Sequence, residues 1–220
     1  MSSDDHYVHA ARRRDAFAHL DPRRTALAVV DMQNYFVAPG YQAEVAPARA
    51  IVPAINRAAA GVRAAGGLVA WVQTSADGAD REWSHLHAEL LTPQASRKRL
   101  EGLAEGSPGF TLWPELAADP RDARVVKTRY SAFLPAPSPL ERLLRARRID
   151  TLLVAGTATN VCCDSTARDA MMLDFRTAML ADANAARTSA LHEQALANFA
   201  AYFGVVFAVD EALARLHAAR

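Results

Sequence analysis

The sequence lacks the features that mark membrane proteins, secreted proteins and nucleic-acid-binding proteins. No apolar run approaches the roughly 18 residues that a transmembrane helix needs, and residues 1–5 lack the basic-then-apolar order of a secretion signal. The formal net charge is only +1, so no excess of charge favours nucleic acid or an anionic membrane as a partner. We expect a cytoplasmic protein whose partners are small molecules or copies of itself.

Cysteine is scarce, and two well-known glycine motifs are missing. The chain has 2 cysteines, Cys162 and Cys163, and because they are adjacent we expect no stabilising disulfide framework. The turn after the first predicted strand holds no glycine-rich phosphate loop, and no Gly-x-Ser-x-Gly motif occurs. These absences argue against dinucleotide binding and against a serine nucleophile on a strand-to-helix elbow.

What the sequence does contain is the pattern of one α/β domain. Its 220 residues are 51% hydrophobic, which is enough for a core on both faces of a sheet. Six short segments rich in branched apolar residues alternate with stretches of helical period, which predicts a three-layer α/β/α sandwich around a parallel sheet. The predicted strands are Thr25–Val30, Gly67–Gln73, Ala123–Val126, Thr151–Ala155, Arg176–Leu180 and Val205–Val209.

Helical spacing connects these strands. Apolar residues recur on one face of Pro47–Ala65, as expected for a helix that packs on a sheet. Ser138 and Thr188 stand where two further helices are predicted to begin, and both are typical N-cap residues. The other predicted helices are Pro139–Arg148, Cys162–Asp174, Thr188–Tyr202 and Asp210–Ala219.

Two segments do not fit the alternation of strands and helices. Residues 75–122 are interrupted by glycine and proline, so we expect an irregular excursion with one or two short helices. This excursion either shapes a ligand pocket or is a passive surface loop. Residues 1–24 carry two arginine clusters and are predicted to be an N-terminal arm, either solvated or used in self-association, ahead of one domain over residues 25–220.

Three chemically active side chains follow predicted strands. Asp31 comes directly after the first strand, Lys127 after the third, and Cys162 lies in the loop between the fourth strand and the next helix. Each also has an ordinary interpretation: a helix cap, a solvated charge and a small core residue, respectively. Because sites in open parallel sheets lie outside the carboxyl ends of the strands, we expect the three groups at one edge.

A carboxylate, an ammonium and a thiol have complementary chemistry. A helix N-terminus favours the thiolate, so we expect the pKa of Cys162 to be lowered and its sulfur to be nucleophilic. Cys163, turned by roughly 100° about the helix axis, is expected to pack in the core. The thiol attacks a carbonyl carbon, Asp31 takes its proton and later protonates the leaving amine, and Lys127 stabilises the thiolate.

From Thr25 to Leu216 the chain resembles the isochorismatase-like cysteine hydrolases, and three motifs in the family's order carry the resemblance. They are AVVDMQNYF at residues 28–36, VKTRYSAF at 126–133 and GTATNVCCDSTARDA at 156–170. They look like the family's opening strand, lysine motif and nucleophile loop. Cys163 stands where the family usually has valine. The resemblance implies that Asp31, Lys127 and Cys162 are a catalytic triad.

The resemblance also implies features that the residues alone do not predict. It implies six parallel strands, a homodimer or homotetramer, and a cis peptide bond between Thr157 and Ala158. The backbone N–H groups of Ala158 and Cys162 would form an oxyanion hole. The implied reaction, without a cofactor, is hydrolysis of a C–N bond in a small amide through a thioester. We favour a carboxamide or a ureido (N-carbamoyl) substrate.

Other activities of the same fold are alternatives. Isochorismatases cleave a vinyl ether without a thiol, and Cys162 argues against that branch. Nicotinamidases hold a metal through an Asp-x-His motif, which residues 73–87 lack. His85 and His87 form an H-x-H pair that zinc can use, but we expect both to be exposed and predict no metal. A catalytically silent binding protein is a further alternative, although no residue of the triad is lost.

Candidate substrate contacts are residues that follow the site motifs or fall in the excursion. Aromatic side chains near such loops are as often core as pocket, so these predictions leave both roles open. The candidates are Gln33, Phe36, Gln73, Trp83, Tyr130 and Phe133.

Overall fold

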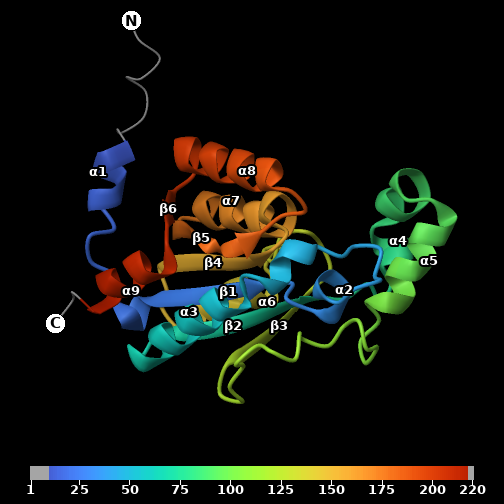
Figure 1. The fold of residues 1–220 in the computed structure, drawn as a ribbon, viewed down its shortest axis with the longest axis horizontal. Helices are drawn as coiled ribbons and strands as arrows, with labels where there is room; N and C mark the ends of the chain where they lie inside the picture. The colour runs from blue at the N-terminus through green and yellow to red at the C-terminus, as the bar shows by residue number, and fades with distance from the viewer. Residues whose placement is uncertain (1–9, 218–220) are drawn as a thin grey trace, which may run out of the picture.

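The computed structural model describes residues 10–217, which fold into a three-layer α/β/α sandwich (Figure 1). All pairings in the six-stranded sheet are parallel, and the strand order is β3-β2-β1-β4-β5-β6. This confirms the predicted fold class. The strands are β1 (Thr25–Val30), β2 (Leu68–Thr74), β3 (Ala123–Lys127), β4 (Thr151–Thr157), β5 (Arg176–Ala185) and β6 (Val205–Phe207).

Helices cover both faces of the sheet (Figure 1). One face packs against α3 (Val52–Ala64) and α9 (Val209–His217). The other packs against α6 (Pro139–Ala146), α7 (Asp164–Met172) and α8 (Ser189–Tyr202). The predicted helix over residues 47–65 is split, because a 3-10 turn, η3 (Ala46–Arg49), precedes α3. None of the described helices is long and apolar enough to span a membrane.

Both predicted N-caps are confirmed. The Ser138 hydroxyl accepts a hydrogen bond from the Glu141 N–H at the start of α6. The Thr188 hydroxyl accepts one from the Leu191 N–H at the start of α8. Each satisfies a backbone donor that has no partner within its own helix.

Strands β1 and β4 lie in the middle of the sheet, and a glycine fixes how closely they approach. Every residue of β1 is buried, as expected for a strand with helices on both faces. Gly156, near the end of β4, has a φ of +119°. A Cβ atom at this position would lie 2.0 Å from the Val30 carbonyl oxygen. Only glycine fits here, and the nucleophile loop begins directly after it.

The described part of the predicted arm packs against the domain rather than into solvent. It forms α1 (Ala10–Asp15) and a 3-10 turn, η2 (Pro22–Arg24). The Arg14 side chain donates to the Val206 carbonyl at 2.7 Å and pairs with Glu211 in α9. Leu20 is fully buried. Residues 1–9 of the predicted arm and residues 218–220 of the predicted domain lie outside the described residues.

The excursion of residues 75–122 contains two short α-helices, as predicted, and a π-helical turn between them. It holds α4 (Ala79–Glu82), a π-helical turn, η4 (Leu86–Leu90), and α5 (Pro93–Gly102). In Figure 1 these helices stand beyond the carboxyl edge of the sheet, on the side of α2 (Asn34–Val37). The excursion therefore lies where the sequence predicts the site.

Candidate active site

The ends of three neighbouring strands bring Asp31, Thr74 and Lys127 together. The Lys127 Nζ atom is 2.9 Å from Asp31 Oδ2 and donates to Thr74 Oγ1 at 2.6 Å. The Thr74 hydroxyl in turn donates to Asp31 Oδ1 at 2.8 Å. All three side chains are buried. The result is an ion pair shielded from water, with each carboxylate oxygen held in a fixed position.

Thr74 is the residue of this cluster that sequence reasoning missed. The predicted second strand ends at Gln73, one residue too early. Thr74 is the last residue of β2 and pairs in register with Lys127. The rule that points to Asp31 and Lys127, inspection of the carboxyl ends of the strands, would have found Thr74 with the correct strand end.

Cys162 lies in a π-helical turn, η5 (Thr159–Cys163), between β4 and α7. Its side chain lines a cavity and is only 6% exposed. The charges of Asp31 and Lys127 both act on this thiol. Cys163 is completely buried in the core between sheet and helices, as predicted. The two adjacent cysteines therefore face different surroundings.

The pKa of Cys162 differs from the sequence expectation. Burial raises the pKa of this thiol to about 12, and the charge of Asp31 acts in the same direction, while Lys127 opposes both. A helix terminus contributes only about 0.3–1 kcal/mol, whereas full burial shifts a pKa by up to about 3–5 units. The expectation of a lowered pKa is therefore wrong, and Cys162 is a neutral thiol near pH 7.

Lys127 stays charged in the same buried cluster. Burial alone would lower its pKa, but the Asp31 carboxylate and the Cys162 sulfur outweigh that effect, and the pKa of Lys127 is raised overall. The Arg129 carbonyl also accepts a hydrogen bond from Nζ at 2.9 Å. The site thus holds a permanent ammonium next to a protonated thiol.

The loop that carries Cys162 has an unusual backbone. The peptide bond between Thr157 and Ala158 is cis, at the position that the resemblance named. The Ala158 carbonyl accepts hydrogen bonds from the N–H groups of Val161 (3.0 Å) and Cys163 (3.2 Å), and the intervening Cys162 N–H is not one of its donors. Ala158 lines the same cavity as Cys162.

This cavity has a volume of about 480 Å³ and opens over the Cys162 sulfur. Two of the predicted substrate contacts, Phe36 and Tyr130, line it. Ala95 and Arg99 of α5 line it as well. Of the two roles that the sequence left open for the excursion, the structure therefore supports the pocket.

Gln33 and Gln73 do not line the cavity. The Gln33 side chain accepts from the Thr74 N–H at 2.7 Å and donates to the carbonyls of Thr74 and Phe110 at 3.1 and 3.0 Å. The Gln73 amide donates to the same Phe110 carbonyl at 2.8 Å. Both amides bind backbone and hold the excursion against β2, which is a structural role beside the predicted one.

Trp83 and Phe133 are also absent from the cavity lining. The Trp83 ring packs against Tyr130, with ring centroids 4.8 Å apart, and against the Arg129 guanidinium. Phe133 is 1% exposed and packs against Phe175 in the core. Of the two roles that the sequence left open for these aromatic side chains, the structure shows packing.

The two histidines of the excursion differ from each other. His85 is exposed and lies 3.2 Å from Glu89, as predicted, but His87 is buried and its Nδ1 atom lies 2.8 Å from the Ser96 hydroxyl. Burial lowers the pKa of His87. Within residues 10–217, no group of three or more His, Cys, Asp and Glu side chains is placed to hold a metal ion. The residues present therefore do not fit a metal of the nicotinamidase kind.

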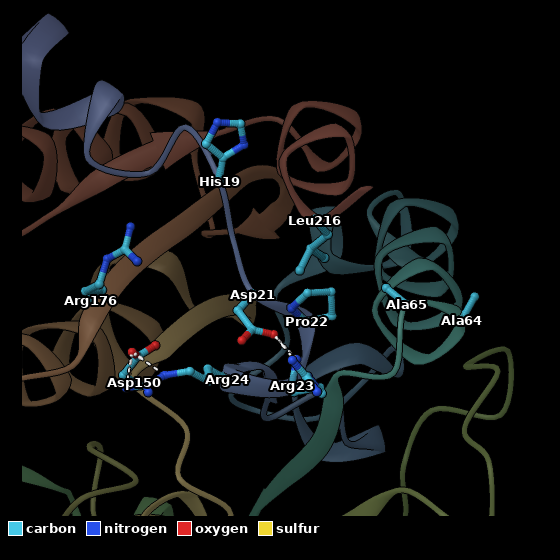
Figure 2. Close-up of a pocket in the computed structure, with 10 residues that line it drawn as sticks. All are labelled: His19, Asp21, Pro22, Arg23, Arg24, Ala64, Ala65, Asp150, Arg176 and Leu216. Atoms are coloured by element: carbon cyan, nitrogen blue, oxygen red, sulfur yellow. Dashed lines mark hydrogen bonds and ion pairs between the residues drawn. The ribbon is translucent and has the colours of Figure 1, made fainter. Parts of the chain in front are cut away.

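A second cavity, of about 570 Å³, lies at the opposite edge of the sheet, where the strands begin (Figure 2). Arg24 pairs with Asp150 at 2.6 Å, and the Asp21 carboxylate accepts from the Arg23 N–H at 2.9 Å. No thiol or hydroxyl side chain lines this cavity. We therefore assign the candidate active site to the carboxyl edge.

Comparisons with known proteins identify the family of the chain. A family model described as the isochorismatase domain matches residues 25–211. The ureidoacrylate amidohydrolase RutB of Methylobacterium radiotolerans is 37% identical over 201 residues, which cover 85% of this chain and 77% of that protein.

Two solved structures are similar over most of the chain. A cysteine hydrolase from Pseudomonas syringae pv. phaseolicola has a TM-score of 0.81 and 32% identity, covering 91% of this chain and 96% of that one. An N-carbamoylsarcosine amidase from Thermoplasma acidophilum has a TM-score of 0.66 and 26% identity, covering 85% and 97%. Fold, motifs and relatives agree, and the chain belongs to the isochorismatase family.

Proposed function

We propose that this protein is a cysteine hydrolase that cleaves a C–N bond in a small ureido (N-carbamoyl) compound or carboxamide. The observation that carries the proposal is the buried Cys162 residue, which lines a cavity and lies within the electrostatic influence of the Asp31–Lys127 ion pair. The similarity to RutB and to an N-carbamoylsarcosine amidase supports a ureido substrate in particular.

The first step couples proton transfer to attack. Because burial raises the pKa of Cys162 to about 12, little thiolate exists before substrate binds. Asp31 takes the thiol proton as the sulfur forms a bond to the carbonyl carbon. Lys127 stabilises the negative charge that passes from the carboxylate to the sulfur and oxygen. Asp31 is thus a general base in this step.

The backbone of the nucleophile loop stabilises the tetrahedral intermediate. The N–H groups of Ala158 and Cys162 bind the oxyanion in this proposal, and each such donor is worth about 3–4 kcal/mol in the transition state. When the C–N bond breaks, the leaving nitrogen takes the proton that Asp31 received, and ammonia departs. The acyl group, or the carbamoyl group of a ureido substrate, remains on the sulfur.

A water molecule completes the cycle. Asp31 takes a proton from this water as the oxygen attacks the thioester carbonyl, and the proton then returns to the departing Cys162 sulfur. Thr74 keeps the carboxylate oriented in both half-reactions, because it holds Asp31 Oδ1 at 2.8 Å while Lys127 holds Oδ2.

Ammonia release tests the proposal. We expect release from at least one member of a panel of N-carbamoyl amino acids, other ureido acids and small carboxamides. Cys162→Ser should lose the activity, and Cys163→Ser should retain it as a matched control one residue away. Equal activity of the wild-type and Cys162→Ser proteins would show that the thiol is not the nucleophile. A folded wild-type protein that binds panel members without turnover would instead support the silent binding protein.

A further inference from the structure

The charged side chains that line the active-site cavity all carry positive charge. They are Arg99, from α5, and Arg187, which follows β5. No aspartate or glutamate is among the lining residues. The Asp31 carboxylate nearby is neutralised by its ion pair with Lys127. The cavity therefore offers an excess of positive charge to whatever binds above Cys162.

Arg99 stands out because its charge has no protein partner. Other partly buried arginines have a partner, which is either an acid, as for Arg63 with Asp122 at 2.8 Å, or a backbone carbonyl, as for Arg129 with Glu82 at 2.8 Å. Within residues 10–217, no ion pair and no side-chain hydrogen bond involves the Arg99 guanidinium, and its Nε atom is buried without a partner. Such a group is costly unless a ligand completes its hydrogen bonds.

The charge of Arg99 acts on the reaction centre. It lowers the pKa of the Cys162 thiol and of the Tyr35 hydroxyl, although burial outweighs it in both groups. Tyr35 and Cys162 both line the cavity. Arg99 and the nucleophile therefore border one cavity of about 480 Å³, which suits a small molecule that contacts both.

Arg187 has a different environment at the same cavity. It is exposed, and its Nη2 atom already donates to the Gln42 carbonyl at 2.9 Å. Solvent can satisfy its remaining donors, so it does not need a ligand to do so. The two arginines thus differ in the property that matters for selectivity, which is how much of the guanidinium is shielded from water.

We propose that Arg99 binds a carboxylate of the substrate, so that the site takes ureido or amide acids in preference to their neutral analogues. This inference rests on the proposed C–N hydrolase function. The planar guanidinium presents paired N–H donors that match the two oxygens of a carboxylate. The carboxylate occupies the α5 side of the cavity while the scissile carbonyl lies over Cys162.

The surroundings of α5 hold Arg99 in place. The Gln42 side chain donates both to the Ala95 carbonyl in α5, at 2.8 Å, and to the Tyr35 hydroxyl, at 2.7 Å. Thr92 caps the start of the helix through the Ala95 N–H at 3.2 Å. The helix that supplies the anchor is therefore tied to the residues that border the nucleophile.

Binding to the inactive Cys162→Ala protein tests the inference without requiring turnover. N-carbamoylglycine, N-carbamoyl-β-alanine and their methyl esters are titrated by calorimetry against proteins with and without Arg99→Gln. We expect Arg99→Gln to weaken binding of the acids by about 10- to 100-fold, as for a hydrogen-bonded charge, and binding of the esters by less than about 3-fold. Arg99→Lys should restore part of the lost affinity for acids, because lysine keeps the positive charge but lacks the paired N–H donors of the guanidinium.

Matched variants separate this role from a structural one. Arg97→Gln removes an exposed arginine from the same helix and should leave acid binding unchanged. The inference would be overturned if Arg99→Gln weakened the binding of acids and of esters equally. It would also be overturned if the preference for acids over esters disappeared in Arg187→Gln but survived in Arg99→Gln. If neither N-carbamoyl acid binds to the Cys162→Ala protein, the inference is overturned too.

Turnover distinguishes the inference from the proposed function. If the protein binds acids selectively through Arg99 but the wild-type protein releases no ammonia, the proposed hydrolase function is contradicted and carboxylate binding by Arg99 is supported. If ammonia is released with the same kcat/KM from acids and esters, and Arg99→Gln does not change these values, carboxylate binding by Arg99 is contradicted and the hydrolase function is supported.

Discussion

Two cavities of similar volume lie at opposite edges of the sheet, and their charged side chains are arranged in opposite ways. At the amino edge, Arg24 meets Asp150 and Arg23 meets Asp21 within the cavity itself (Figure 2). At the carboxyl edge, the acid of the site is buried in an ion pair beneath the nucleophile, and Arg99 is left without an acid.

The difference teaches that volume does not identify an active site. The amino-edge cavity is the larger, at about 570 Å³ against 480 Å³, but Arg23 and Arg24 in its lining are exposed and pair with acids. The carboxyl-edge cavity borders groups that are shielded from water and lack the partners they need. Unsatisfied, desolvated groups are where binding a ligand gains free energy. The predictions below test this contrast.

The largest effect is expected from Cys162→Ala. Loss of a nucleophile that acts together with its base lowers kcat by about 10³-fold or more. Ammonia release under single-turnover and steady-state conditions measures it. Cys163→Ala is the control: it removes a buried sulfur from the core and should cost stability but little activity. A Cys162→Ala protein with more than a few per cent of wild-type kcat would contradict the assignment.

Lys127→Met should destabilise the protein strongly. It leaves Asp31 buried without a cation, and breaking a buried ion pair by removing one partner costs about 3–5 kcal/mol. Urea denaturation measures the change in the free energy of unfolding. The double variant Asp31→Asn with Lys127→Met removes both charges and should recover part of that stability while leaving no activity. A loss under about 1 kcal/mol for Lys127→Met would mean that the pair is solvated.

Gly156→Ala should also destabilise by several kcal/mol. The new Cβ meets the Val30 carbonyl oxygen at 2.0 Å, and neither central strand can move without breaking the sheet. Gly66 is the matched control at the amino edge, with a φ of +90° and nothing within 4 Å of an added Cβ. Gly66→Ala should lower the free energy of unfolding by only about 1–2 kcal/mol, because a residue with a side chain is strained at this positive φ. Similar losses for both variants, measured by thermal unfolding, would show that the loop relaxes.

The sequence predicted the sheet and pointed to Asp31, Lys127 and Cys162 because both inferences depend on local patterns. Buried strands of a parallel sheet are continuous apolar runs, and β1 begins and ends where predicted. Asp31 follows such a run directly, Lys127 ends one and Cys162 lies in the loop after one, so their shared edge comes from topology. The N-caps Ser138 and Thr188 likewise act on residues only three positions away.

The rest of the site depends on contacts between distant residues. The Gln33 amide binds the Phe110 carbonyl, 77 positions away, and no local pattern predicts that partner. Arg99 reaches the cavity only because the whole excursion folds over the carboxyl edge. The pKa of Cys162 is likewise a sum of burial and neighbouring charge, whereas sequence reasoning counted the helix terminus and Lys127 but not burial.

The reactivity of Cys162 should rise steadily with pH. With burial raising its pKa to about 12, the thiolate fraction grows about tenfold per pH unit from pH 7 to pH 10. The alkylation rate with iodoacetamide in a Cys163→Ala background should follow this slope without a plateau. Asp31→Asn removes a charge that raises the pKa, so it should speed alkylation at pH 8 while stopping turnover. A plateau below pH 9 in the unmodified site would contradict the raised pKa.

The smallest effect is expected at the amino edge. Arg24→Gln breaks the ion pair with Asp150, whose partners are 56% and 35% exposed, and exposed pairs contribute only about 0.2–1 kcal/mol. The free energy of unfolding should fall by no more than that, and kcat/KM should not change, because this cavity lies at the far end of the strands from Cys162. The loss should shrink further in 1 M salt, where exposed charges are screened over about 3 Å. A larger loss in the free energy of unfolding, or a change in kcat/KM, would mean that the amino-edge cavity serves the reaction although its charges are paired.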